Sequence, residues 1–120
     1  MSERDITLYL KDILQAIDSI EKFVKDMNFE EFKNNDLVSS AVIRKFEIIG
    51  EASRNIPKEI RKKYPDIPWK TMIGFRDKLI HFYFGIKYEL VWKAIKVNLP
   101  ELKEKIKKIY EDLKKPNEKN

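Results

Sequence analysis

The chain has 120 residues, with 25 Lys or Arg against 20 Asp or Glu, so its formal net charge is +5, and 42% of its residues are hydrophobic. This length suits one globular domain with a core of its own. Three Gly and five Pro exclude collagen-like and low-complexity sequence. The absence of Cys rules out disulfides, thiolate metal sites and cysteine catalysis, and the single His rules out a metal cage with two His ligands.

Hydropathy and charge point to a soluble chain. No apolar run approaches the roughly 18 residues that a membrane span needs, and the first ten residues are unlike a secretory leader. We therefore expect a cytoplasmic protein without a membrane partner. Residues 1–57 carry 8 basic and 11 acidic side chains, whereas residues 58–120 carry 17 basic and 9 acidic ones. Such a basic half attracts polyanions, but Lys-rich helices also serve solubility, so charge alone leaves both interpretations open.

The first half of the chain has the periodicity of helices. Apolar residues recur at spacings of four and three from Ile6 to Met27, which predicts a helix of about six turns along this stripe. A second apolar stripe predicts a helix over residues 41–56, preceded by Asp36 as a candidate N-cap. Prolines within and beside residues 58–68 leave room for at most one helical turn there.

Two further helices are predicted in the second half. One starts after Pro68 and ends at Gly85, and because it is apolar on more than one face, we expect it to be buried against both the core and a second subunit. The last covers the apolar stripe of residues 91–113 and is a candidate for a kink at Pro100. Lys87, just before it, is a poor N-cap.

These elements predict an all-α fold. Long amphipathic helices with short connections pack antiparallel, which gives an up-and-down bundle of four main helices plus short helical turns. No repeat or Gly-Ser linker divides the chain. We therefore expect a single domain over residues 1–115, followed by a frayed polar tail over residues 116–120.

Candidate chemistry is concentrated in residues 76–83, since the usual motifs for nucleotide, zinc and serine-hydrolase sites are missing. His81 is the only side chain whose ordinary pKa lies near neutrality, which makes it the one natural proton shuttle. Asp77 lies one helical turn earlier, where its carboxylate could orient the imidazole. Arg76 and Tyr83 share a neighbouring face of the same helix. The plainer alternative is a packed or surface His, a surface ion pair and an amphipathic Tyr.

The spacing Arg76-x4-His81-x-Tyr83, with polar Asp77 after the Arg, resembles the R-x4-H-x-Y signature of HepT-type toxins within the HEPN domains. The resemblance extends to residues 44–52, which are similar to the family's IGEA-bearing helix. It also extends to the approach through residues 68–75 and to Val91-Trp92 in the following helix. It covers essentially residues 5–110.

This resemblance implies an all-α HEPN-like homodimer that cleaves RNA without a metal or other cofactor, by attack of a ribose 2′-hydroxyl. Arg76 would bind and polarise the scissile phosphate, His81 would be the general acid or base, and Asp77 would support them. Tyr83 is similar to the tyrosine that a cognate minimal nucleotidyltransferase antitoxin modifies with AMP in this family. The implied function is a ribonuclease toxin of a toxin–antitoxin system.

Other interpretations remain open at this level. The same motif could serve a non-catalytic helical partner subunit of a nucleotidyltransferase, and a basic bundle could bind RNA without cleaving it. Glu47 and Glu51 could form a carboxylate pair for a metal, although two carboxylates on one helix make a poor site and solvent exposure explains them. Gly50 is interpreted as a point of close helix approach rather than of ligand binding.

Overall fold

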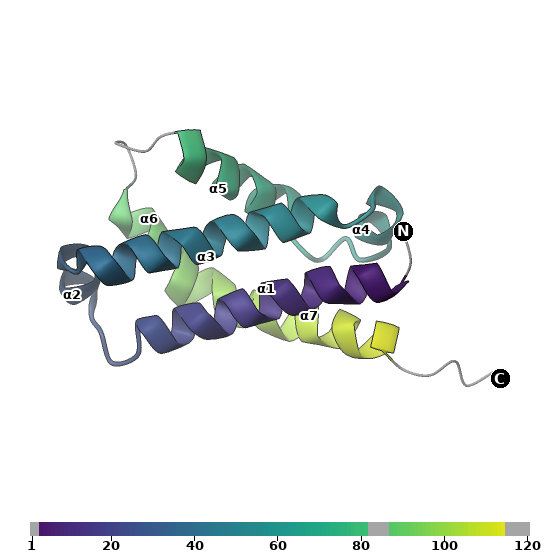
Figure 1. Cartoon of the computed structure of the whole chain (residues 1–120), viewed down its shortest axis with the longest axis horizontal. Helices are drawn as coiled ribbons and strands as arrows, with labels where there is room; N and C mark the ends of the chain where they lie inside the picture. The colour runs from purple at the N-terminus through teal and green to yellow at the C-terminus, as the bar shows by residue number, and fades with distance from the viewer. Residues whose placement is uncertain (1–2, 82–86, 115–120) are drawn as a thin grey trace.

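A computed structural model describes residues 3–81 and 87–114, and only the backbone of residues 3, 4 and 81. The described chain forms helices and no strand (Figure 1). This confirms the predicted all-α class. In chain order the elements are α1 (Glu3–Phe23), α2 (Phe29–Asn34), α3 (Asp36–Asn55), α4 (Lys58–Lys63), α5 (Trp69–His81), α6 (Tyr88–Lys93), the π-helical segment η1 (Ala94–Asn98) and α7 (Leu99–Lys114).

The first helix is shorter than its apolar stripe. α1 ends at Phe23, and Asp26 beyond it takes a left-handed backbone conformation, with φ of 63°. The stripe nevertheless continues, because Val24 stays in the core after the helix has ended and Met27 packs against it. An apolar pattern therefore marked burial correctly here but misplaced the end of the helix.

Side-chain caps determine where the next two helices begin. Asn28 and Glu31 form a reciprocal capping box that starts α2, in a stretch where the sequence predicted no helix. Asn35, rather than Asp36, is the N-cap of α3, because its side-chain oxygen accepts a hydrogen bond of 3.0 Å from the backbone N–H of Val38. α3 consequently begins one residue before the start that an N-cap at Asp36 predicts, and five residues before the apolar stripe at residue 41.

The second half agrees with the prediction in part: α5 begins after Pro68 as expected, while its predicted end at Gly85 lies outside the described residues. α4 spans six residues, slightly more than the single turn expected. Just before Pro100, where the sequence suggested a kink, the helix widens into η1, in which the backbone N–H of Leu99 donates to the carbonyl of Ala94, five residues back. Pro100 has no N–H to continue the regular ladder, which explains a wider turn at this place. Lys87 is the N-cap of α6 and provides no side-chain cap, as the sequence indicated.

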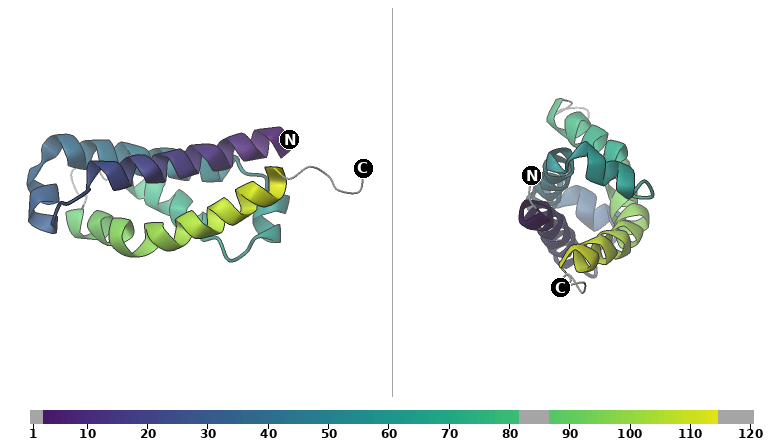
Figure 2. Two further views of the ribbon diagram at one scale, coloured as in Figure 1. Left: turned by 90° about the horizontal axis from the view of Figure 1, so that it is seen from below. Right: turned by 90° about the vertical axis from the view of Figure 1, so that its right-hand side faces the viewer.

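The main helices run alternately up and down, with α5 beside α3, α3 beside α1, and α1 beside α7 (Figures 1 and 2). One contiguous core joins them. At one end, Phe32 of α2 packs on Trp92 of α6 with ring centroids 5.2 Å apart, which ties the short helices to the bundle. No helix in residues 3–81 and 87–114 combines the length and the apolar character of a membrane span.

Candidate active site

The site begins at a close crossing of α3 and α5. Gly50 on α3 is buried, and a Cβ atom at this position would overlap the Cβ of Arg76 and lie 2.9 Å from the carbonyl oxygen of Met72. Only a residue without a side chain allows the α5 backbone to come this near. The predicted role of Gly50 in close helix approach is thereby confirmed. The crossing also fixes the position of the first side-chain atoms of Arg76 against α3.

The Arg76 guanidinium lies between two carboxylates. Its Nη1 donates a hydrogen bond of 3.0 Å to Oδ1 of Asp77, and its Nη2 lies 3.6 Å from Oε2 of Glu51 on α3. The side chain is 23% exposed, so it is held by the protein and still reaches solvent. A guanidinium has a planar fork of donors that matches the oxygens of a phosphate, so this group is suited to hold one.

Asp77 has a second cationic partner, Arg54 on α3. Nη2 of Arg54 donates to both carboxylate oxygens, at 2.8 Å to Oδ1 and 2.9 Å to Oδ2. The hydrogen bond from Arg76, with the positive charges of Arg54 and Arg76, holds the pKa of Asp77 below its usual value. Asp77 is therefore ionised at neutral pH. Glu51, Arg54, Arg76 and Asp77 together are called the four-charge cluster below.

The cluster borders a recess of about 200 Å³ between α1, α3 and α5, which we call the Arg76 recess. Its walls combine apolar and aromatic side chains with carboxylates, an amide and a second arginine. The lining residues are Tyr9, Asp12, Arg44, Glu47, Ile48, Glu51, Ala52, Asn55, Arg76 and Ile80. A wall of mixed polar and apolar side chains beside a guanidinium is typical of a binding site, whereas a packing void in the core would be lined by apolar side chains.

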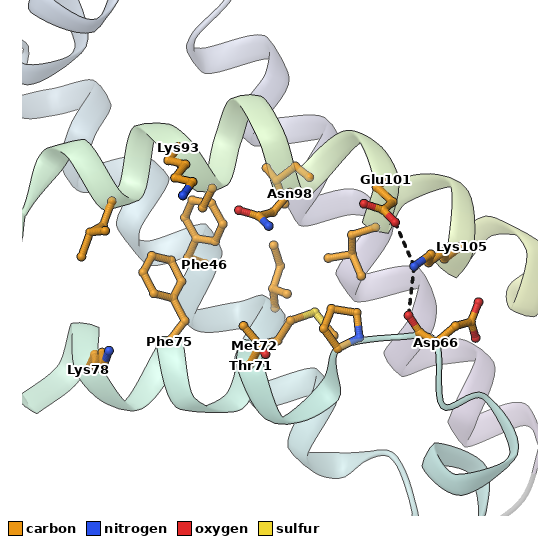
Figure 3. Close-up of a pocket in the computed structure, with 16 residues that line it drawn as sticks. Phe46, Asp66, Thr71, Met72, Phe75, Lys78, Lys93, Asn98, Glu101 and Lys105 are labelled. Atoms are coloured by element: carbon orange, nitrogen blue, oxygen red, sulfur yellow. Dashed lines mark hydrogen bonds and ion pairs between the residues drawn. The ribbon is translucent and has the colours of Figure 1, made fainter.

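A larger groove of about 580 Å³ lies along the other flank of α5 (Figure 3). Phe75 of α5 and Phe46 of α3 meet edge to face in its wall, with ring centroids 5.2 Å apart. Lys105 of α7 closes one end by contacting Glu101 at 3.0 Å and the carbonyl of Asp66 at 3.0 Å. Between its ends the groove is lined by Asn98 and Thr71 beside apolar and aromatic side chains. Arg76 lines the recess and not this groove, so we place the candidate chemistry at the Arg76 recess.

The predicted site residues have different outcomes. Arg76 and Asp77 are in direct contact, as neighbours of one cluster. The backbone of His81 is the last described part of α5, and its side chain lies outside the described residues, as does Tyr83. The contact from Asp77 to the imidazole therefore stays a prediction. Arg54 was missed, although its position four residues after Gly50 and three after Glu51 places all three on neighbouring turns of one helix face.

The two glutamates of α3 have cationic partners rather than solvent alone. Glu47 is 3.3 Å from Nη1 of Arg44, one turn earlier, while Glu51 faces Arg76. The explanation by solvent exposure is therefore incomplete. Within residues 3–81 and 87–114, as far as their side chains are described, no three His, Asp or Glu side chains gather closely enough to hold a metal ion.

Comparisons with known proteins identify the family. The family model described as "Ribonuclease HepT-like" matches residues 13–109. The chain therefore belongs to the HepT-like ribonuclease family. This confirms the resemblance drawn from residues 76–83 and the class of enzyme that it implied, a ribonuclease.

Similar proteins agree with this assignment. "Putative RNase MJ0125" of Methanocaldococcus jannaschii is 53% identical over 113 residues, which cover 94% of this chain and 97% of that protein. "Putative RNase MJ1216" of the same organism is 49% identical, with 98% of both chains covered. "Probable ribonuclease HepT" of Thermococcus cleftensis is 48% identical over 84% of this chain and 92% of its own. The comparison with solved structures gave no match.

Proposed function

We propose that this chain is a metal-independent endoribonuclease and the toxin of a toxin–antitoxin system. The observation that carries the proposal is the position of Arg76. The root of its side chain packs at the Gly50 crossing. Its guanidinium is held by Asp77 and Glu51 and borders a recess, in a chain of a ribonuclease family. A phosphate-binding group held in this way is preorganised for a charge that develops during reaction.

In the proposed reaction, Arg76 binds the scissile phosphate and His81 moves the proton. The ribose 2′-oxygen forms a bond to phosphorus while the bond from phosphorus to the 5′-oxygen breaks. The 2′-hydroxyl gives up its proton to a base and the departing 5′-oxygen gains one from an acid. The products are a 2′,3′-cyclic phosphate and a 5′-hydroxyl. Asp77, ionised and bound to Arg76, would keep the guanidinium oriented.

A homodimer would complete the site by bringing two copies of α5 together. Support comes from apolar side chains that this part of the molecule exposes: Ile80 on α5 is 42% exposed, and Leu90, at the edge of the groove beside α5, is 53% exposed. Light scattering at working concentration should give twice the mass of one chain. A monomer would remove the composite-site mechanism.

Tyr83 is the proposed target of a cognate nucleotidyltransferase antitoxin. AMP groups attached two residues after His81 would add bulk and negative charge near the phosphate-binding arginine. RNA would then be excluded by sterics and by like-charge repulsion. Incubation with the partner enzyme and ATP should raise the mass of the wild type by AMP units and leave Tyr83→Phe unchanged.

The decisive experiment is an RNase assay in EDTA on total RNA, with analysis of the product ends. Wild type should leave cyclic phosphate ends, and His81→Ala and Arg76→Ala should each lose at least about a hundredfold in rate. Thr71→Ala, an exposed change on the same helix, is the matched control and should cleave like wild type. No cleavage by unmodified dimeric wild type would favour the non-catalytic partner subunit instead.

A further inference from the structure

Arg54 is outside the R-x4-H-x-Y motif, yet it makes the closest polar contacts in the four-charge cluster. One of its nitrogens binds both oxygens of Asp77 at 2.8 and 2.9 Å, whereas Arg76 binds a single oxygen at 3.0 Å. The contact spans 23 residues and joins α3 to α5. It is therefore a tertiary feature of the site and not a by-product of one helix.

The surroundings of Arg76 explain why a second arginine matters. Each of its two terminal nitrogens already faces a carboxylate, Asp77 on one side and Glu51 on the other. An incoming RNA phosphate must compete with both carboxylates for the same donors. Two carboxylates and two guanidiniums make the four-charge cluster neutral. Without Arg54 the cluster would carry a net negative charge, which repels a phosphate.

Asp77 also keeps a cationic partner when Arg76 binds a phosphate instead. Because Arg54 binds both of its oxygens, the carboxylate keeps a cation if Nη1 of Arg76 turns to a phosphate. The exchange then does not leave Asp77 unpaired. Asp77 and Arg54 are 41% and 46% exposed, so the effect depends on salt and is moderate in size.

We propose that Arg54 is a positioning residue for RNA binding: it holds Asp77 and offsets its charge, so that Arg76 is free to engage a backbone phosphate. This inference rests on the proposed ribonuclease function, in which Arg76 binds the scissile phosphate. It assigns Arg54 no contact with RNA. Its effect on RNA therefore passes through Asp77, which a double variant can test.

The test measures binding and cleavage separately. Binding is followed by fluorescence anisotropy with a 2′-O-methyl RNA oligonucleotide, which has no free 2′-hydroxyl to attack, and cleavage by steady-state kinetics on the unmodified RNA. Arg54→Gln should raise Kd and KM about three- to fivefold at low salt, and the effect should shrink between about 50 and 200 mM salt. kcat should change little, because ground-state binding is what is lost.

Two further variants separate charge from contact. Arg54→Lys keeps the charge and should bind RNA nearly as wild type does. Arg54→Gln combined with Asp77→Asn removes one charge of each sign and should bring Kd back toward the wild-type value. Lys108→Gln, an exposed loss of one positive charge on α7, controls for net charge and should change Kd less than Arg54→Gln does.

Several outcomes would overturn the proposal. One is an Arg54→Gln variant that binds no more weakly than Lys108→Gln. Another is a double variant as weak as Arg54→Gln alone, which would mean that Arg54 contacts RNA directly. Thermal melting of each variant excludes simple unfolding as the cause. If the variants bind RNA with the expected affinities but wild type does not cleave it, the nuclease function is contradicted and the role of Arg54 in binding is supported. If wild type cleaves RNA but the variants do not bind with the expected affinities, the nuclease function is supported and the role of Arg54 is contradicted.

Discussion

The pairs α1–α7 and α3–α5 are held together in different ways. α1 and α7 meet through apolar stripes, and Lys103 of α7 also binds Glu21 at 2.8 Å and Asp18 at 3.3 Å on α1. α3 and α5 also share apolar contacts, but they meet closely at a glycine and place four charged side chains beside it. One pair therefore contributes chiefly stability, while the other uses a close approach to position ionised groups. Substitutions in the α1–α7 pair should therefore lower mainly stability, whereas substitutions at the α3–α5 crossing should also lower activity.

The largest effect on stability is expected in the apolar pair. Ile106 of α7 is fully buried, so Ile106→Ala should lower the free energy of unfolding by about 3 kcal/mol, through lost burial and a cavity. Urea denaturation of the purified variant measures it. Leu37→Ala, at a side chain that is 80% exposed, is the control and should change stability by less than about 0.5 kcal/mol. Equal losses in the two variants would contradict the assigned core.

The second effect should appear in both stability and activity. Gly50→Ala forces α5 away from α3, since the new methyl group meets the root of the Arg76 side chain and the Met72 carbonyl. We expect a loss of about 1–2 kcal/mol, after the gain in helix propensity is counted. The rate of RNA cleavage should fall much more than it does in an equally destabilised core variant, because Arg76 is displaced.

Gly74→Ala is the matched control for this change. A Cβ at Gly74 of α5 meets nothing within 4 Å, so the substitution should raise stability by about 0.5–1 kcal/mol through helix propensity and leave cleavage unchanged. If Gly50→Ala behaved like Gly74→Ala, the close crossing would not determine the position of Arg76.

The contrast also shows what the sequence could predict. The α1 stripe was predictable because burial on a single helix face recurs with a period of 3.6 residues, and the motif around Arg76 was visible as a local spacing. The contact from Arg54 to Asp77 was not, since it depends on how α3 and α5 are aligned across the Gly50 crossing. Sequence reasoning paired Asp77 with His81, one turn away, while the nearest described partners are Arg54 on another helix and adjacent Arg76.

Helix ends were hard to predict for a related reason. The start of α3 depends on the Asn35 side chain reaching the N–H of Val38, and several polar residues in this stretch could have been the cap. The end of α1 depends on Asp26 in the left-handed region, while the apolar stripe continues past it. Periodicity reports which residues are buried, and hydrogen bonds decide where the helix stops.

A smaller effect is expected at the edge of the apolar pair. Hydrogen bonds to Glu21 and Asp18 raise the pKa of Lys103, so its contribution to stability is present below the unfolded value of about 10.4 and is lost as pH rises through the higher folded value. Lys103→Gln should cost about 0.5 kcal/mol at neutral pH, measured by urea denaturation. The difference from wild type should vanish at strongly alkaline pH, and one that persists there would indicate lost packing instead of lost charge.

The smallest effect concerns the acid side of the charged pair. Because the Arg76 hydrogen bond and the neighbouring charges lower the pKa of Asp77, its ion pairs contribute to stability above the unfolded value of about 3.9. That contribution is lost as pH falls through the lower folded value. A carbon NMR titration of the Asp77 carboxyl should give a midpoint below about 3.9 in wild type. Arg76→Ala and Arg54→Gln should each raise this midpoint, because each arginine donates to the carboxylate and places a positive charge beside it. A variant that leaves the midpoint unchanged would show that its arginine does not stabilise the ionised carboxylate.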